Sequence, residues 1–472
     1  MFADRHLRGT YVVVAFVATG IFYGAAVAAL TDNWYLAVVA VIGLIAGIVT
    51  FIEPVWGLYL FVATMFAEGL LIVTSGFTAA KLLGILVFGA WVVHSLVIEK
   101  HFQIVLPVQC WFVIGFVAWG WLSALWALDA QLVFSHIPTL IQSVGLYILV
   151  VNLVNSPERV RNLLFIIIMV SLVLSLLTIF NLFSGEVIAG RADAREVSGD
   201  DPNFLAAHIL PTAALLMALF SQETRLSRKL FLLAVLLLAV VGILSTSSRG
   251  GVVALAVILI FSPMLDRRMW RVVFPALLVI GAILYLLPET VLGRIESLFT
   301  LSNRGTGRLD IWLVAWHMFR VHPLLGVGLG NFGMAFRRYL ADTVGLTTHL
   351  FLPPTVDPHN IYISTLSSLG VIGFALFIIV VGLSVKNGLV AVLRLKRKGD
   401  PHLTTLAIGA YLSLLGVLSA GMFIDLDDQK YFWLLLALAE VMRRLSLAPA
   451  REDSRDSNKR ACRRERREHL PT

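Results

Sequence analysis

The chain has 472 residues, of which 58% are hydrophobic and only 14% are charged, and its formal net charge is +8. Its mean hydropathy is +0.87. These values exclude a soluble globular protein and indicate a polytopic membrane protein.

Long apolar segments predict the fold. A helix needs about 20 apolar residues to cross the hydrocarbon core of a membrane. The sequence therefore predicts an all-α, polytopic helical membrane protein with about 12–14 transmembrane helices. The pairs 34–51/55–74 and 231–247/250–265 have very short connections, so either pair could instead be a re-entrant or broken hairpin. The count would then be twelve full spans. The expected spans are 11–30, 34–51, 55–74, 82–98, 108–126, 138–154, 162–183, 203–220, 231–247, 250–265, 272–287, 359–384, 404–424 and 431–446.

The placement of basic residues predicts the orientation. If the N-terminus is cytoplasmic, most of the 37 Lys and Arg residues fall in inner loops and in the C-terminal tail, as the positive-inside rule requires. Both termini are then cytoplasmic, and the large loop 288–358, which we expect to contain short helices, faces outward. The positive net charge is thus mostly a topology signal and does not indicate nucleic-acid binding.

This organisation divides the chain into three regions. Residues 1–183 form N-terminal transmembrane helices, and residues 184–446 form a membrane region that carries the chemistry and includes the loop 288–358. Residues 447–472 are highly charged and lack apolar periodicity, so they predict a disordered basic cytoplasmic tail. Cys110 lies in a span and Cys462 in the tail, so no disulfide is expected.

The stretch from Gly307 to Gly373 is unusually rich in Arg, His, Asn and Gly for so hydrophobic a chain. It begins GRLDIWLVAWHMFRVHPLLGVGLGNF and ends DPHNIYISTLSSLGVIG. Long loops of this kind are usually functional or disordered, and this one carries too many apolar residues for disorder. We expect the chemistry here, with the loop as a lid and Gly326, Gly328 and Gly330 folding its backbone over the substrate.

Arg249 is the most unusual charge. It lies in LSTSSRGGVVAL, between two apolar runs, where a charge is costly and by default marks a functional site or a buried partner. Gly250 and Gly251 allow a close approach of the backbone, and the following helix directs its N-terminus toward the same place. The alternative is an arginine at a hairpin tip that extends to the membrane interface.

Two further outer segments carry polar residues at the start of a span. In GRADAREVSGDDPNFLAAH, Arg191 and Arg195 precede Asn203, and either arginine could instead pair with nearby carboxylates. In DPHN, His359 precedes Asn360 at the membrane boundary; a histidine can accept a proton at physiological pH, although it can also be a simple cap. The cluster Asp425-Leu426-Asp427-Asp428 is interpreted as a polar turn rather than a metal site.

Together these pieces resemble the bacterial O-antigen ligase and O-antigen polymerase superfamily. The matching residues are Arg195 with DPNFLA (201–206), SSRGG (247–251), Arg308 with Trp312, HPLLGVGLGNF (322–332) and HNIYISTLSSLGVIG (359–373). The last two blocks, in this order across a long outer loop, are the most specific. The resemblance covers roughly 191–382.

The resemblance implies an inverting membrane glycosyltransferase without metal or other cofactor, in the bacterial inner membrane with its active site facing the periplasm. It implies an undecaprenyl-pyrophosphate-linked glycan donor and, as acceptor, lipid A–core for a ligase or another glycan for a polymerase. His359 is then the candidate base, and Arg249 with Arg195 the pyrophosphate clamps. The remaining candidates for substrate binding are Arg191 (the alternative to Arg195), Arg308, Asn203, Asn360 and Tyr362.

Three other functions stay open in the sequence. A polymerase of O-antigen or exopolysaccharide repeat units shares every motif, and a protein O-glycosylating transferase belongs to the same superfamily. A lipid or polysaccharide transporter fits the composition, but transporters usually place ionisable residues in the middle of spans and often show internal repeats. Here the span centres are almost free of charge, which favours an enzyme at the outer surface.

Overall fold

The computed structural model describes residues 34–66, 72–74, 77–100, 103–184, 187–188, 191–192, 202–286, 307–346 and 356–449. The predicted first span at 11–30 and nearly all of the predicted tail lie outside these residues. The described elements are, in chain order, α2 (Trp34–Ile52), α3 (Pro54–Met65), β1 (Ile72–Thr74), β2 (Phe77–Thr78), α4 (Ala79–Val93), the π-helix η2 (His94–Ile98), α5 (Val108–Leu122), the 3-10 turn η3 (Ser123–Leu125), α6 (Ala130–Leu153), α7 (Pro157–Phe183), β3 (Val187–Ile188), β4 (Arg191–Ala192), α9 (Pro202–Gln222), α10 (Leu226–Ser245), α11 (Arg249–Leu265), the 3-10 turn η4 (Arg267–Met269), α12 (Trp270–Leu286), α14 (Arg308–Val321), α15 (Phe332–Leu340), α16 (Ile361–Lys398), α17 (Pro401–Ala420) and α18 (Lys430–Leu447).

The predicted all-α polytopic fold is confirmed. A helix lies at each expected span from residue 34 onward, and eight of the described helices are long and apolar enough to cross a membrane. In the described residues the strands form two short antiparallel ribbons, β1–β2 and β3–β4. The outer loop contains short helices, as predicted, in α14 and α15.

Two predicted spans have the wrong length. The expected span 55–74 is wrong, because α3 has 12 residues, a length of roughly 18 Å, and Ile72–Thr74 is a strand. Such a helix is too short to cross the membrane, which favours the broken-hairpin alternative for this pair. In contrast, α16 continues past the expected end at 384 to Lys398, because the charged segment that follows keeps good helix formers.

Local sequence determines where several helices begin. Ser156 caps α7 by accepting from the N–H of Arg159, and Asp400 caps α17 by accepting from the N–H of Leu403. In both helices a proline follows the cap, where its missing N–H costs nothing. These polar caps fix the boundaries between the connections and the apolar runs.

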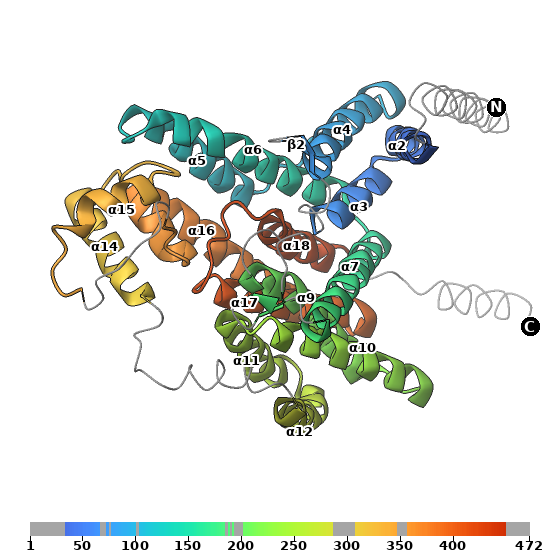
Figure 1. The fold of residues 1–472 in the computed structure, drawn as a ribbon. Helices are drawn as coiled ribbons and strands as arrows, with labels where there is room; N and C mark the ends of the chain where they lie inside the picture. The colour runs from blue at the N-terminus through green and yellow to red at the C-terminus, as the bar shows by residue number, and fades with distance from the viewer. Residues whose placement is uncertain are drawn as a thin grey trace, which may run out of the picture.

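The helices α9 and α17 form the centre of the bundle (Figure 1), and their apolar segments are 78% and 83% buried. They approach closely because small residues lie between them: a Cβ on Gly409 would come within 2.8 Å of Leu215. In membranes, where lipid is as apolar as the side chains, close packing of this kind drives helix association.

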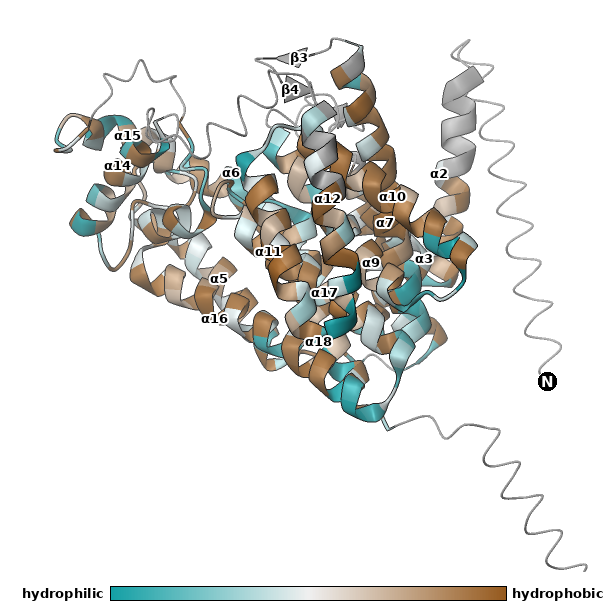
Figure 2. Ribbon diagram, turned by 90° about the horizontal axis from the view of Figure 1, so that it is seen from below, coloured by the Kyte–Doolittle hydropathy of each residue, from teal (hydrophilic) through white to brown (hydrophobic). Residues whose placement is uncertain are grey.

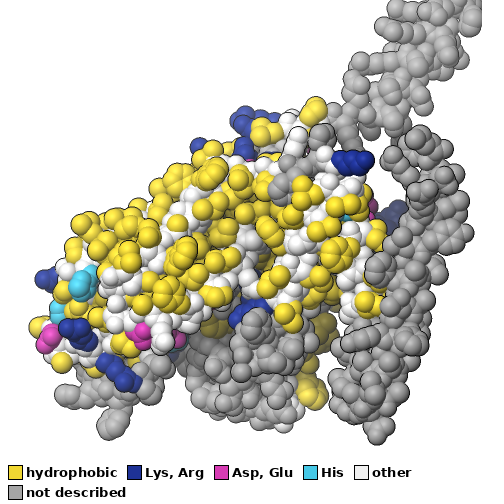
Figure 3. All heavy atoms as spheres, turned by 90° about the horizontal axis from the view of Figure 1, so that it is seen from above, with side chains coloured by type: hydrophobic (Ala, Val, Ile, Leu, Met, Phe, Trp, Pro, Cys, Tyr) yellow, Lys and Arg dark blue, Asp and Glu magenta, His cyan; other side chains and the backbone are white. Residues whose placement is uncertain are grey.

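The outward surface suits a lipid environment. Ile85, Phe165 and Phe180 are 60–65% exposed, and Figure 3 shows a broad band of hydrophobic side chains with Lys and Arg at its borders. Figure 2 shows mainly hydrophobic residues through the bundle and hydrophilic residues on α14 and α15. The structure therefore has an apolar surface band bordered by polar residues, as expected of a multi-pass membrane protein.

Contacts between connections agree with the predicted alternation of spans. At one end, Arg268 donates to Gln222 and Gln222 donates to Asp266, so the α9–α10 and α11–α12 connections meet. At the other end, which we call the loop end, the starts of α9, α11 and α16 meet the α17–α18 turn, as described below. The connections in these contacts are therefore divided between the two ends as the predicted alternation of spans requires.

A buried polar network joins α5, α16 and α18 near the end opposite the loop end. Glu440, whose side chain is 1% exposed, accepts hydrogen bonds from Asn387 at 2.8 Å and from both nitrogens of the Arg443 fork, at 2.8 and 2.7 Å. Asn387 also donates to Gln109 of α5 at 3.2 Å. One carboxylate therefore supplies the acceptors for side chains on two helices.

We expect Glu440→Ala to destabilise the protein by about 3 kcal/mol, because it leaves the partly buried Arg443 without its carboxylate and removes one of the two acceptors of the buried Asn387. The measurement is the melting temperature in detergent, together with the monodisperse fraction. Glu158→Ala is the control, because Glu158 pairs with Arg161 at 3.6 Å with both side chains mostly exposed. Equal shifts for the two variants would contradict the structural role of the network.

Candidate functional site

The turn that carries Arg249 is tightly built. Ser247 has a positive φ of 50°, and Ser248 caps α11 by accepting from the N–H of Gly251 at 3.0 Å. The Ser248 hydroxyl donates to the side-chain oxygen of buried Asn203 at 2.7 Å, which joins the turn to the start of α9. Arg249 is the first residue of α11 and is half-buried.

His359 lies in a strained backbone. Its φ is 48°, a left-handed conformation that costs a non-glycine residue about 1–2 kcal/mol. Its N–H donates to Asp425 Oδ2 at 2.9 Å. Asn360 then caps α16 by accepting from the N–H groups of Tyr362 and Ile363, and the Tyr362 hydroxyl donates to the Leu418 carbonyl at 2.8 Å.

The α17–α18 turn, residues 421–429, joins the two motifs. The N–H of Ile361 donates to the carbonyls of Gly421 and Ile424, at 2.9 and 3.2 Å, so the turn holds the backbone on both sides of Asn360. The same turn touches the arginine motif, since a Cβ on Gly250 would come 2.8 Å from Phe423 Cβ. Arg249 and His359, 110 positions apart in sequence, therefore flank one turn.

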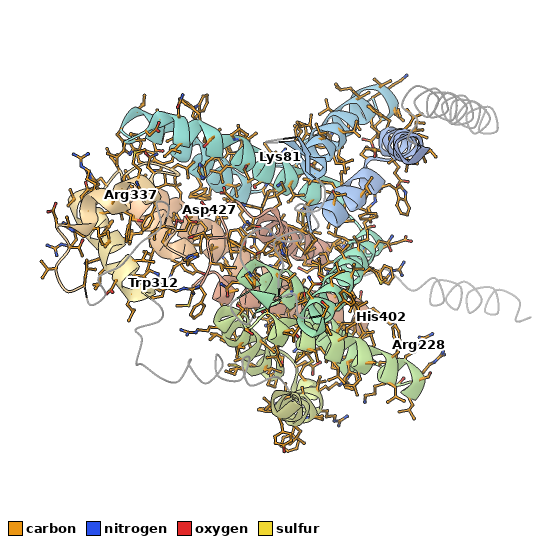
Figure 4. All side chains as sticks on the ribbon, viewed as in Figure 1. Lys81, Arg228, Trp312, Arg337, His402 and Asp427 are labelled. Atoms are coloured by element: carbon orange, nitrogen blue, oxygen red, sulfur yellow. The ribbon has the colours of Figure 1, made fainter. Side chains whose placement is uncertain are left out.

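Arg308 belongs to α14, a helix that contacts the segment before His359. It is the first residue of that helix and follows Gly307, which has a positive φ of 84°. One helical turn later, Trp312 Nε1 donates to the Pro358 carbonyl at 2.9 Å, immediately before His359. Figure 4 shows Trp312, Arg337 and Asp427 toward one side of the molecule and Arg228 and His402 toward the other.

The loop is attached to a break in α16. Gly370 has φ 66° and ψ −169°, a conformation essentially restricted to glycine, inside the membrane helix. The carbonyls that the break frees accept from other segments: Ser367 from Val327 N at 3.1 Å, and Ser368 from Gly328 N at 2.8 Å. Leu369 accepts from the indole of Trp119 at 3.0 Å. Beyond the break, the N–H of Val371 donates to the Pro323 carbonyl at 2.8 Å.

This docking corrects the expected role of the glycines. Gly326 approaches the Ser368 carbonyl so closely that a Cβ would lie 2.4 Å away, and Gly328 packs on Ala127. Both therefore serve contacts within the protein instead of folding over a substrate. Gly330, which packs on His136, is the one of the three that lines the cavity described next. Residues 323–330 thus form a fixed wall.

A cavity of about 230 Å³ lies between this wall, the α17–α18 turn and the segment before His359. Asp357, Asp425, Asp427, Asp428 and His136 bring ionisable groups to its lining. Uncharged residues, both apolar and polar, complete the lining: Phe116, Phe204, Leu329, Gly330, Phe332, Gly333, Pro358, Ser364, Thr365, Ser368, Leu369 and Gln429.

The carboxyl groups perturb one another. Burial raises the pKa of Asp425 well above its ordinary value, the carboxylates of Asp427 and Asp357 raise it further, and the N–H groups of His359 and Asn360 oppose this rise. Burial and the neighbouring Asp428 raise the pKa of Asp427 to about 7. Perturbed groups gathered in a cavity are typical of functional sites. In the described residues no group of three or more His, Cys, Asp or Glu is arranged to hold a metal ion.

Two predicted residues are not placed by this geometry. Arg195 lies outside the described residues. Arg191 lies in β4, paired with Ile188 of β3, and its side chain is also outside the description. The structure brings together Asn203, Arg249, Arg308, His359, Asn360 and Tyr362 at the loop end.

Sequence reasoning missed Asp425, Phe423 and His136. The sequence correctly indicates that Asp425 lies in a polar turn, but it does not indicate a role in the site. The available signal is that three carboxyl groups, those of Asp425, Asp427 and Asp428, lie in a short connection on the same predicted membrane face as Asp357 of DPHN. His136 lies in an apolar run of α6, and its approach to Asp428, at 4.0 Å, depends on the tertiary fold.

The fold and the site define a multi-pass α-helical membrane protein with its polar chemistry gathered at one end. Residues 233–378 match the family model described as O-antigen ligase, which confirms the predicted resemblance to the O-antigen ligase superfamily. The match includes Arg249, Arg308 and His359 and ends before Asp425. No curated protein matches the chain. The family indicates a glycan-transferring membrane enzyme of the ligase or polymerase type.

We expect Gly370→Ala to disrupt the docking of the loop. A Cβ there would lie 2.2 Å from the Leu324 carbonyl, and the backbone conformation itself excludes alanine. Limited proteolysis should cleave the 323–346 segment faster, and the melting temperature should fall. Gly382→Ala in the same helix is the control, because a Cβ meets nothing within 4 Å there. If Gly370→Ala behaved like Gly382→Ala, the break would not anchor the loop.

The raised pKa of Asp427 predicts a pH dependence of stability. Between about pH 4 and 7 the unfolded chain loses this proton while the folded protein keeps it, so stability falls as pH rises through this window and is flat above it. Asp427→Asn should flatten that part of the plot of melting temperature against pH. The substitution leaves the neighbouring ionisable groups of His136 and Lys430 in place. Asp342→Asn, an exposed site on the outer loop, should leave the slope unchanged. An unchanged slope in Asp427→Asn would refute the assignment.

Proposed function

We propose that this protein is an inverting glycosyltransferase that moves a glycan from undecaprenyl pyrophosphate to a hydroxyl of an acceptor sugar. The acceptor that we favour is lipid A–core, as in an O-antigen ligase, and the alternative is a second lipid-linked repeat unit, as in a polymerase. We place the reaction at the loop end, facing the periplasm from the bacterial inner membrane.

One observation carries the proposal: the α17–α18 turn contacts both the Arg249 motif and His359. A transferase of this kind needs a cation for the leaving pyrophosphate beside a base for the incoming hydroxyl. Arg249 and Arg308 are the first residues of two helices that begin near this place, and helix N-termini also favour anions. The side chains of Asn203, Asn360 and Tyr362 are engaged in hydrogen bonds within the protein, so in this proposal they shape the site.

The proposed reaction is a direct displacement. His359 takes the proton of the acceptor hydroxyl, and the oxygen forms a bond to the anomeric carbon while the bond from that carbon to the pyrophosphate oxygen breaks. The pyrophosphate leaves with the electron pair, and the guanidinium of Arg249, with Arg195 or Arg191, stabilises the developing charge. Attack from the opposite face inverts the anomeric centre. The cavity beside His359 offers carboxyl oxygens and aromatic side chains for the acceptor sugar.

His359→Ala and Arg249→Ala should each lower glycan transfer by at least about 100-fold, because each removes a group that acts in the transition state. The measurement uses purified protein in proteoliposomes with an undecaprenyl-pyrophosphate-linked glycan and lipid A–core. Arg337→Ala on α15 and His402→Ala at the opposite end are matched controls, since both side chains are exposed. Transfer at the wild-type rate by His359→Ala would show that this histidine is not the base.

Deletion of the gene separates the two acceptors. Loss of glycan attachment with accumulation of free lipid-linked polymer identifies a ligase. Products limited to single repeat units identify a polymerase.

A further inference from the structure

We propose that Asp425 is a positioning residue that holds His359 in its catalytic orientation, an inference that rests on the proposed function. Asp425 belongs to the α17–α18 turn and lies outside the family-matched region. Its Oδ2 accepts from the N–H of His359 at 2.9 Å.

The backbone at His359 needs such a partner. A histidine with φ of 48° persists only where its surroundings over-determine it. Asp425 accepts from the N–H groups of His359 and Asn360, and the carbonyls of Gly421 and Ile424 accept from Ile361. Three consecutive N–H groups therefore bind one turn, and the strained residue is the first of them. These hydrogen bonds fix the backbone from which the imidazole of His359 extends.

Burying a carboxyl group to accept these hydrogen bonds costs free energy. Main-chain carbonyls of the same turn accept the hydrogen bonds from Ile361 without that cost. Asp425 has a second oxygen, Oδ1, that is buried and has no hydrogen-bond partner among the described residues. Asp357 and Asp427 raise the cost of ionising it. Asp425 therefore has two roles. Its Oδ2 accepts the hydrogen bond that fixes the backbone of His359, and its side chain forms part of the cavity wall beside that residue.

The positioning role predicts how substitutions of Asp425 change kcat and KM. If Asp425 acts through His359, its loss should lower kcat by about 100-fold, the effect expected of a misplacement by about 1 Å, with a KM for the donor that changes little. Asp425→Asn keeps an acceptor oxygen for the N–H and should stay within a few-fold of wild type. Asp425→Ala should show the full loss.

The decisive experiment is a double-mutant cycle with His359→Gly, which tolerates the positive φ. Transfer is measured in proteoliposomes for His359→Gly and for the double variant with Asp425→Ala, with added imidazole and, over long incubations, without it. Free imidazole does not depend on the backbone at 359. The expected result is that Asp425→Ala changes the rate of His359→Gly by less than about 2-fold, against about 100-fold in the wild-type background.

Three outcomes overturn the inference. Asp425→Ala at the wild-type rate shows that the bond does not matter. An equal loss in both backgrounds shows that Asp425 contacts substrate directly, and so does a loss in Asp425→Asn as large as in Asp425→Ala. Monodispersity and melting temperature in detergent establish that each variant is folded. If His359→Gly itself transfers at the wild-type rate, the proposed function has failed at the base, a result distinguishable from failure of the Asp425 contact.

Discussion

The satisfaction of backbone polar groups at two irregular segments is the constraint on which this structure depends. Within a membrane, non-helical backbone is tolerated only where protein or a water-filled cavity covers it. The break at Gly370 is covered by residues 323–328 and Trp119, and the entry to α16 at 359–361 is covered by the α17–α18 turn. Both coverings lie at the loop end, and together they bound the cavity.

These two attachments explain why the site can combine residues so distant in sequence. The outer loop is tied to α16 through its backbone, and α16 is tied to α17–α18 through His359 and Ile361. The same turn packs on Gly250, beside Arg249. Attachments of this kind hold the side chains of the site in fixed relative positions. Enzymes obtain much of their rate acceleration from such preorganisation. The loop that the sequence indicated as a lid is, in its described part, the frame of the site.

The sequence was sufficient for the elements that depend on composition. Apolar runs place the helices from 34 onward, and the polar segments at Asn203 and Asn360 place the starts of α9 and α16. Periodicity and length could not reveal that α3 ends at Met65, because Ile72–Thr74, which lie inside the expected span, pair as a strand with Phe77–Thr78. The kink at Gly370 was also hidden, since one glycine in an apolar helix carries no sign that Ser367 and Ser368 bond elsewhere. Such breaks depend on tertiary partners.

The candidate site divides in the same way. Arg249 and His359 were identifiable because charge at a membrane boundary is costly and because their motifs match a family. The contributions of Asp425 and His136 arise only when α6 and the α17–α18 turn meet. Their meeting places acidic groups next to the arginine-bearing helix starts, so the loop end has a cationic part and an acidic part. In the proposed reaction this separation has a physical use. The pyrophosphate, a polyanion, is attracted to the arginines, whereas a neutral sugar hydroxyl can form hydrogen bonds with the carboxyl groups of the cavity. Donor and acceptor would therefore be bound by different groups at the loop end.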